Sequence, residues 1–344
     1  MGSYSIGYKR NITFLIMLNI FSGGCYSKNN IISYNDAALE YSGRWIDTGS
    51  GKWTGWAGAP PVRFKVRNTS SIKINAACID PGNASLCFLT ANIDNDPIAP
   101  TAFYHTTLAE TFTGNRSVTI PMINDGNWHT ITIHVGGFIY DTYIQYSKTT
   151  ITSYQIDFGG EVDGWTQGTK KIQCVGDSWM GTSADWPRLM STSLYDCNYI
   201  SAGGMDVATM NTQYNYDYSG TLNTSDVNVD AVIVSFGVND LHFAISQAAF
   251  EASLSSLVDK IRAKQATAKI FLIRVPSNVT TGEDYGKYGT NMSNVAGVKS
   301  NCYYINTSSL DATITWYSDT YHLDSKGKQT LANFIKTELI AAGI

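Results

Sequence analysis

Lys171-Ile-Gln-Cys-Val-Gly-Asp-Ser-Trp-Met180 is the stretch that decides the organisation of the second half of the chain. It begins as a short apolar strand, Ile172 to Val175, and it breaks at Gly-Asp-Ser-Trp. A strand that ends in this way leaves a hydroxyl group at its carboxyl end, the edge where open α/β sheets bind ligands. Ser178 is therefore a candidate nucleophile if a base can reach it. Gly-Asp-Ser is also common in ordinary turns, so the rest of the chain must supply the partners.

Residues 171–344 alternate between short apolar runs and helical patterns, which predicts a three-layer α/β domain with a parallel sheet. An amphipathic helix is expected over 248–264 and a closing helix over 325–342, with Asp324 as its cap. Pro187 suits a first helical turn and indicates that a helix opens at Trp186. Five strands are expected, at 172–175, 198–202, 231–236, 269–275 and 302–305.

Residues 41–160 have a period of two instead, as in Val62-Arg-Phe64-Lys-Val66 and Ile131-Thr-Ile133. Many short alternating strands with turns such as Asn124-Asp-Gly-Asn127 predict a β-sandwich of the jelly-roll type. Residues 161–170 are the expected linker between the two domains. Three tryptophans near the start of the sandwich fit either core packing or a sugar-facing surface at the domain junction: Trp45, Trp53 and Trp56.

Three other strand ends in the second domain carry residues that a purely structural sheet would not need. Gly203-Gly204 follows the second strand, and Gly237-Val-Asn239-Asp240 follows the third. Asp319-Thr-Tyr-His322 comes between the fifth strand and the closing helix. Because the carboxyl ends of parallel strands meet at one edge of a sheet, these groups are expected near Ser178.

Together these motifs resemble the SGNH (GDSL-type) hydrolase superfamily over about residues 170 to 344. The resemblance implies that Ser178 is the nucleophile, that His322 is its base and that Asp319 orients His322. These roles agree with the chemistry of the side chains. A serine hydroxyl needs a base to remove its proton, and histidine titrates near neutral pH. A carboxylate three residues earlier can bond the other ring nitrogen and fix its tautomer.

The same resemblance implies an oxyanion hole and an ester hydrolysis that passes through an acyl-serine. Fixed donors to a developing oxyanion are worth about 3–4 kcal/mol each. The glycine spacing after the second strand departs from the family, so Gly203 and Gly204 are both candidates and Gly204 is favoured. The expected donors are the N–H of Ser178, one of these glycine N–H groups and the side chain of Asn239. We expect Asp240 to hold the loop.

A β-sandwich followed by an SGNH domain resembles the two-domain esterases that remove acetyl groups from polysaccharides. Three residues near the nucleophile or near Asp240 are the expected substrate contacts: Trp179, Trp186 and His242. Trp179 also departs from the family, which usually has leucine there. A low charged fraction of 15% with 21 Tyr and 8 Trp is consistent with an acetylated glycan as the partner.

Other partner classes are less consistent with the sequence. A net charge of −4 with no basic cluster argues against nucleic acid and anionic membranes. No Cys or His spacing suggests a metal site, and no cofactor is expected. The alternatives are a lipase or thioesterase of the same superfamily, a glycan-binding protein with a degenerate hydrolase domain, and a phage protein that deacetylates host glycans. Retention of the nucleophile, the base, the acid and the asparagine argues against a degenerate site.

The first 25 residues resemble an export signal, because Lys9-Arg10 precedes an apolar run at 12–21. Small residues before Cys25 also resemble a bacterial lipoprotein site, so export is expected, and a lipid anchor at Cys25 is the one route by which this sequence would attach to a membrane. Residues 26–40 are then a polar tether.

The remaining cysteines and histidines are assigned structural roles. Cys78 and Cys87 flank a turn and could form a hairpin disulfide. Buried thiols are expected at Cys174, Cys197 and Cys302, and structural or surface histidines at His105, His129 and His134.

Overall fold

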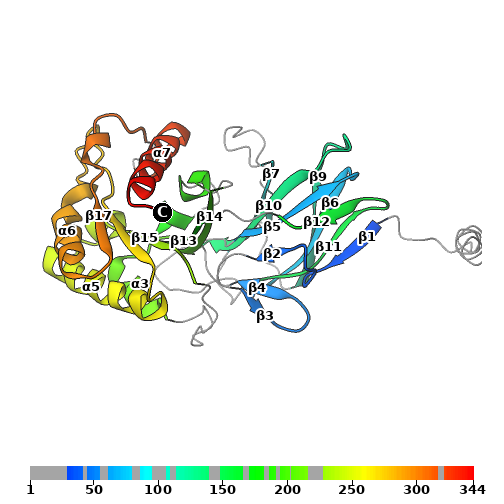
Figure 1. The fold of residues 1–344 in the computed structure, drawn as a ribbon, viewed down its shortest axis with the longest axis horizontal. Helices are drawn as coiled ribbons and strands as arrows, with labels where there is room; N and C mark the ends of the chain where they lie inside the picture. The colour runs from blue at the N-terminus through cyan, green and yellow to red at the C-terminus, as the bar shows by residue number, and fades with distance from the viewer. Residues whose placement is uncertain are drawn as a thin grey trace, which may run out of the picture.

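The chain folds into a β-sandwich followed by an α/β domain (Figure 1). The structure is a computed structural model. It describes residues 29–41, 45–54, 61–79, 86–94, 106–108, 114–138, 148–165, 170–181, 186–190, 194–201, 203–215, 228–316 and 321–344.

The sandwich consists of two six-stranded antiparallel sheets. The first has the order β3-β4-β11-β6-β9 with β1 beside β11, and the second has the order β12-β5-β10-β7-β8 with β2 beside β5. Their bounds are β1 Asn29–Ser33, β2 Glu40–Tyr41, β3 Ile46–Asp47, β4 Lys52–Thr54, β5 Pro61–Arg67, β6 Ser71–Ile79, β7 Leu86–Ile93, β8 Thr106–Leu108, β9 Gly114–Pro121, β10 His129–Phe138, β11 Lys148–Asp157 and β12 Glu161–Asp163.

The period-two prediction for this domain is confirmed by its core. Val62, Phe64 and Val66 on β5 are fully buried, and Ile72 and Ile74 on the facing sheet pack into the same cluster. Alternate side chains of a strand point to opposite faces, so each sheet contributes one apolar face to the interior.

Both boundaries predicted for the sandwich are wrong by several residues. The predicted tether contains β1, which pairs with β11, and the predicted linker contains β12, which pairs with β5. These strands were missed because they are short edge strands, Asn-Asn-Ile-Ile-Ser and Glu-Val-Asp, with too few apolar residues to show a period. In the described parts of the chain, no helix has the length and apolarity needed to cross a membrane.

Trp45 packs in the sandwich core, where its ring centroid lies 4.9 Å from that of Tyr41, so core packing is confirmed for this residue. Trp53 lies in β4, and Trp56 lies outside the described residues. The hairpin predicted for Cys78 and Cys87 is wrong, because β6 and β7 belong to different sheets.

Three histidines were assigned structural or surface roles in the sandwich, and the side-chain contacts of His129 are described. His129 is buried and structural, and it bonds two carboxylates, that of Asp94 at 2.6 Å and that of Asp125 at 2.9 Å. These bonds agree with a structural role. His134 lies in β10, and His105 lies outside the described residues.

The α/β domain contains the predicted five-stranded parallel sheet, in the order β14-β13-β15-β16-β17. The strand after β13 in the chain, β14, lies on one side of β13, and all later strands lie on the other side. Ligands bind outside the carboxyl ends of the strands at such a switch point, here between β13 and β15. The strand bounds are β13 Lys170–Gly176, β14 Tyr195–Ser201, β15 Ala231–Ser235, β16 Lys269–Ile273 and β17 Cys302–Ile305. Cys174 on β13 and Cys197 on β14 are buried, as predicted, whereas Cys302 on β17 is only partly buried.

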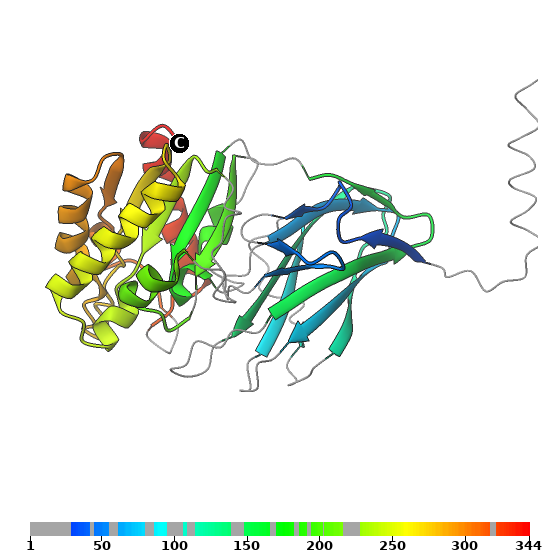
Figure 2. The ribbon, with the colours of Figure 1, turned by 90° about the horizontal axis from the view of Figure 1, so that it is seen from below.

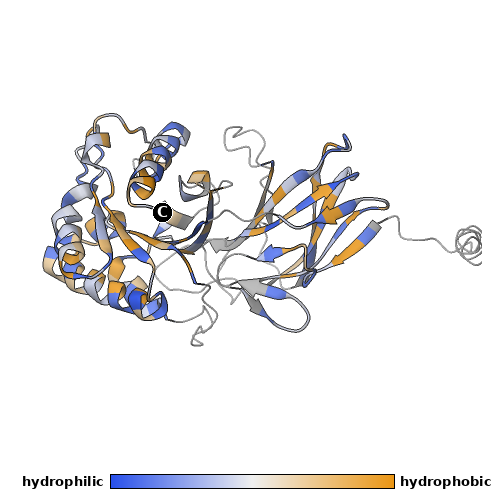
Figure 3. Ribbon diagram, in the orientation of Figure 1, coloured by the Kyte–Doolittle hydropathy of each residue, from blue (hydrophilic) through white to orange (hydrophobic). Residues whose placement is uncertain are grey.

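Helices cover both faces of this sheet (Figures 1 and 2). One face packs against α3 (Val207–Gln213), α5 (Gln247–Lys264) and α6 (Gly289–Val298). The other packs against α7 (Ser325–Ala341) and the short 3₁₀ helix η1 (Trp186–Met190). The α5 and α7 helices have apolar and polar sides, visible in Figure 3, as their sequences predict.

A buried ion pair joins the two domains. Arg63 on β5 donates to the carboxylate of Asp196 on β14, and also to the carbonyl oxygen of Cys197 at 3.3 Å. Its guanidinium lies 4.8 Å from the ring centroid of Trp165. Arg63 is 1% exposed and Asp196 is 3% exposed, so the pair is shielded from water. The edge strand β14 of the parallel sheet is thereby fixed to the sandwich.

Candidate active site

The predicted nucleophile lies at the end of β13, in the first turn of α2 (Ser178–Gly181). Gly176 permits this turn, because a β-carbon there would lie 2.3 Å from Met180 Cγ and 2.7 Å from the carbonyl oxygen of Ser235. Asp177 is fully buried, and its Oδ1 accepts a hydrogen bond of 2.9 Å from the N–H of Trp179. The Gly-Asp-Ser sequence therefore builds a fixed turn that presents Ser178.

His322 lies within hydrogen-bond distance of the serine. Its Nε2 is 3.0 Å from Ser178 Oγ, which is the geometry that a general base needs. The residue precedes α7, whose cap Asp324 accepts from the N–H of Gly327 at 2.8 Å, as predicted. Asp319 lies outside the described residues, so its role as the orienting acid stays a prediction.

Asn239 lies beside the nucleophile turn, in α4 (Val238–His242) after β15. Its Nδ2 donates to Asp177 Oδ2 at 3.1 Å and to the carbonyl oxygen of Met205 at 3.3 Å. Gly237 has a φ of 139°, which favours glycine, and this turn brings Asn239 toward β13. The role of Asp177 in orienting Asn239 was missed from the sequence, although its place in the Gly-Asp-Ser motif was the available signal.

The two candidate glycines lie in the turn after β14. A β-carbon built on Gly203 would lie 3.8 Å from Ser178 Cβ, so this residue lies against the nucleophile. Gly204 is exposed and has a φ of 72°, a left-handed conformation that explains the glycine. Both stay candidate oxyanion donors.

The predicted substrate contacts at Trp179 and Trp186 are wrong. These side chains are 3% and 1% exposed, so neither can stack on a sugar ring. The indole of Trp179 faces the loop that carries the base, and its Nε1 donates to the carbonyl oxygen of Tyr321 at 2.8 Å. Both were misassigned because nearness to Ser178 in sequence does not show which way a side chain points from a helical turn.

His242 is exposed, as a substrate contact must be. Its ring centroid lies 6.3 Å from that of Tyr321 and 5.6 Å from that of Phe243. Tyr321 is 41% exposed and Phe243 is 48% exposed, so the three rings form an accessible aromatic surface beside His322.

A known protein family has a sequence pattern that matches the part of the chain containing Ser178, Asn239 and His322. The model of the GDSL-like Lipase/Acylhydrolase family matches residues 163–330. These residues form a GDSL-like lipase/acylhydrolase domain. The match confirms the prediction that this domain is an SGNH (GDSL-type) hydrolase, an enzyme that hydrolyses carboxylic esters. No curated protein matches the sequence.

Solved structures share the fold over both domains. A family two carbohydrate esterase from Cellvibrio japonicus is 14% identical, with a TM-score of 0.69 and coverage of 90% of this chain and 97% of its own. A family two carbohydrate esterase from Clostridium thermocellum, in complex with cellohexaose, is 16% identical, with a TM-score of 0.67 and coverage of 88% and 98%. An acetyl xylan esterase from the rumen bacterium Butyrivibrio proteoclasticus is 12% identical, with a TM-score of 0.62 and coverage of 91% and 99%.

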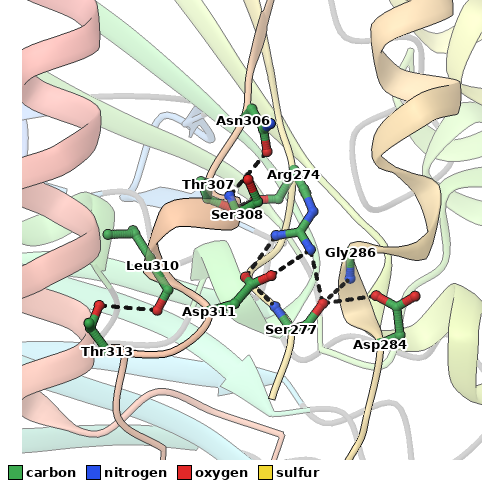
Figure 4. Close-up of polar contacts among 10 residues, drawn as sticks. All are labelled: Arg274, Ser277, Asp284, Gly286, Asn306, Thr307, Ser308, Leu310, Asp311 and Thr313. Atoms are coloured by element: carbon green, nitrogen blue, oxygen red, sulfur yellow. Dashed lines mark hydrogen bonds and ion pairs between the residues drawn. The ribbon is translucent and has the colours of Figure 1, made fainter. Parts of the chain in front are cut away.

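A polar cluster holds together the segments that follow β16 and β17 (Figure 4). Arg274 donates to both carboxylate oxygens of Asp311 at 2.8 Å, and its guanidinium also donates to Ser277 Oγ at 3.0 Å. Ser277 Oγ in turn donates to Asp284 and accepts from the N–H of Gly286. A bidentate, largely buried arginine pair of this kind holds the backbone that follows β16 in one geometry.

Asp240, next to Asn239, has an unusual environment in the hydrolase domain. Its side chain is fully buried, and Oδ1 accepts from the N–H of Val207 at 3.1 Å. Among the described residues Oδ2 has no hydrogen-bond partner. Burial raises the pKa of Asp240 to about 7, the charge of Asp206 adds to the rise, and the Val207 N–H opposes it. Asp240 thus holds the start of α3, as expected, rather than contacting Ser178.

This burial predicts a pH-dependent loss of stability that Asp240→Asn should remove. A carboxyl group whose pKa is raised on folding stabilises the folded state in its protonated form, and this contribution is lost as pH rises through about 7. Between pH 4 and pH 8 the free energy of unfolding of the wild type should fall relative to that of D240N by up to about 4 kcal/mol. Urea denaturation across this range measures the difference. The exposed Asp259→Asn is the control, and a D240N difference that stays constant with pH would contradict the assignment.

Proposed function

We propose that the protein is a serine esterase that removes O-acetyl groups, or other short acyl groups, from a polysaccharide. The observation that carries this proposal is the 3.0 Å contact between Ser178 Oγ and His322 Nε2 at the carboxyl edge of the sheet. A nucleophile and a base in this contact, inside a GDSL-like acylhydrolase domain, fit acyl transfer to serine.

In the proposed reaction His322 Nε2 takes the proton of Ser178 as Oγ bonds to the acyl carbon. The C–O bond to the sugar then breaks, and the sugar oxygen leaves with the proton from His322. Water attacks the acyl-serine in the same way, with His322 again accepting and returning a proton, and releases the acid. In this proposal Asp319 bonds the other ring nitrogen and keeps Nε2 aimed at Ser178.

The oxyanion formed in each step would bond the N–H of Ser178, a glycine N–H at 203 or 204, and Asn239. Asn239 is held for this role by the carboxylate of Asp177, which fixes its amide plane. Its second contact, to the carbonyl oxygen of Met205, is the longer of the two at 3.3 Å. We expect the oxyanion to replace that weaker contact, because a charged acceptor bonds more strongly than a carbonyl.

Two observations support a carbohydrate ester as the substrate. Structural neighbours over both domains are carbohydrate esterases, one in complex with cellohexaose and another described as an acetyl xylan esterase. In addition, the exposed rings of His242, Phe243 and Tyr321 lie beside the base, and exposed aromatic rings can pack on the apolar faces of sugars. Export, with or without a lipid anchor at Cys25, agrees with a polymeric substrate and stays part of the proposal.

A substrate panel tests this proposal. Acetate release from acetylated polysaccharides and hydrolysis of p-nitrophenyl esters of increasing chain length should be measured beside Ser178→Ala. We expect acetyl esters to be cleaved at least ten times faster than octanoyl esters, with S178A at background. A preference for long chains would favour the lipase or thioesterase. Wild-type rates equal to those of S178A, together with glycan binding, would favour a degenerate binding protein.

A further inference from the structure

Two neighbouring contacts connect the nucleophile turn to the loop that carries the base. Ser178 contacts His322 at 3.0 Å, and the next residue, Trp179, donates its indole N–H to the carbonyl oxygen of Tyr321 at 2.8 Å. Consecutive residues of one segment thus bond consecutive residues of the other. We propose that Trp179 is a positioning residue, whose indole hydrogen bond sets the place of His322 relative to Ser178. The inference rests on the proposed esterase chemistry.

The side chain of Trp179 is buried, so its hydrogen bond differs from one made on the protein surface. The Trp179 side chain is 3% exposed and its indole N–H lies in a partly buried contact, where losing a hydrogen bond costs more than losing one at the open surface. The leucine that is usual at this position in the family has no N–H and could not replace it. Packing against Trp316, whose ring centroid lies 5.4 Å from that of Trp179, holds the indole in one orientation.

The loop is also held on the other side of His322. Leu323 pairs with Trp316 in an antiparallel bridge, and Asp324 bonds Thr315 through backbone and side chain. Trp316 packs on Tyr285 at 5.4 Å, and Tyr285 lies in the segment that the Arg274 cluster of Figure 4 holds. The residues on both sides of His322 are therefore anchored, and Trp179 supplies the anchor that lies next to the nucleophile.

A purely structural role for Trp179 would predict that any well-packed aromatic ring suffices. The positioning role predicts that the N–H matters by itself, because displacing a catalytic group by about 1 Å can cost on the order of 100-fold in rate. Trp179→Phe keeps a ring and removes the donor, and Trp179→Leu removes both. Trp186→Phe is the matched control: this indole is also buried in the same core cluster, but among the described residues its Nε1 bonds nothing.

The test compares kinetics of these variants on p-nitrophenyl acetate. We expect W179F to lower kcat about tenfold or more with KM within twofold, W179L to lower it at least as much, and W186F to stay within twofold. A W179F kcat within twofold of the wild type would overturn the proposal. If W179F does not fold, 3-benzothienylalanine at 179, which replaces the indole N–H with sulfur at nearly constant shape, takes its place with the same expectation.

Nuclear magnetic resonance separates this inference from the proposed function. The ring nitrogen shifts of His322 report its hydrogen bonds without turnover, and they should change in W179F but not in W186F. If wild-type and S178A rates are equal, the esterase proposal fails and these shifts alone decide the positioning role. Unchanged His322 shifts in a folded variant without the N–H would overturn it.

Discussion

Replacing His322 with alanine should lower kcat for an acetyl ester by about 10,000-fold or more. The serine hydroxyl depends on a base in its first step, and removing one member of a Ser-His pair removes almost the full benefit of both. The 3.0 Å contact to Ser178 supports the proposal that His322 is that base. The residual rate should come from the oxyanion donors and from substrate binding. Steady-state kinetics on p-nitrophenyl acetate measures the effect. Its nitrophenolate leaves with little protonation, so the assay reports mainly on proton removal from Ser178.

The matched control for this prediction is His242→Ala. His242 is exposed beside Tyr321 and is a candidate substrate contact rather than a base. We expect H242A to change kcat for the small ester by less than threefold and to act mainly on KM for a polysaccharide. A similar loss of kcat in both variants would remove the distinction between base and binding residue and would contradict the assignment of His322.

The second large effect is expected for the free energy of unfolding. Arg63→Ala should lower it by about 3–5 kcal/mol, because the variant removes the cation of a buried ion pair. The loss should affect both domains, since Arg63 lies on β5 of the sandwich and Asp196 on β14 of the catalytic sheet. Urea denaturation followed by tryptophan fluorescence measures the change.

Two controls separate the burial of this pair from its charge. Arg67→Ala removes an exposed pair with Glu161 and should leave the midpoint almost unchanged. The double replacement R63M/D196L removes both charges and should recover most of the stability lost in R63A, because buried pairs often gain little over apolar side chains. A double variant no more stable than R63A would contradict the explanation that R63A loses stability by breaking a buried charge pair.

The sequence predicted the contact between Ser178 and His322 well because its signals are local. Ser178, Asn239 and His322 each follow a strand or precede a capped helix, and parallel strands place such ends at one edge. The closing helix was predicted to within a residue because Asp324 caps it and its apolar positions repeat regularly. Asp319 could be predicted only from the resemblance, and it lies outside the described residues.

Other features depend on contacts that no local pattern reveals. The α6 helix (Gly289–Val298) contains two glycines and few strong helix formers, so it is stabilised by burying Met292 and Val295 rather than by propensity. The direction of Trp179 depends on a carbonyl oxygen 142 residues away. The pairing of Arg63 with Asp196 spans 133 residues, so no sequence window could reveal it.

The central claim is that Ser178 is a nucleophile activated by His322. It is tested most directly by mass spectrometry of the protein after reaction with diethyl p-nitrophenyl phosphate, a reagent that traps activated serines. The account predicts one covalent adduct in the wild type, located by fragmentation of the tryptic peptide 172–188 to Ser178, and far slower labelling of H322A. An adduct at another residue, or equal labelling of wild type and H322A, would contradict it.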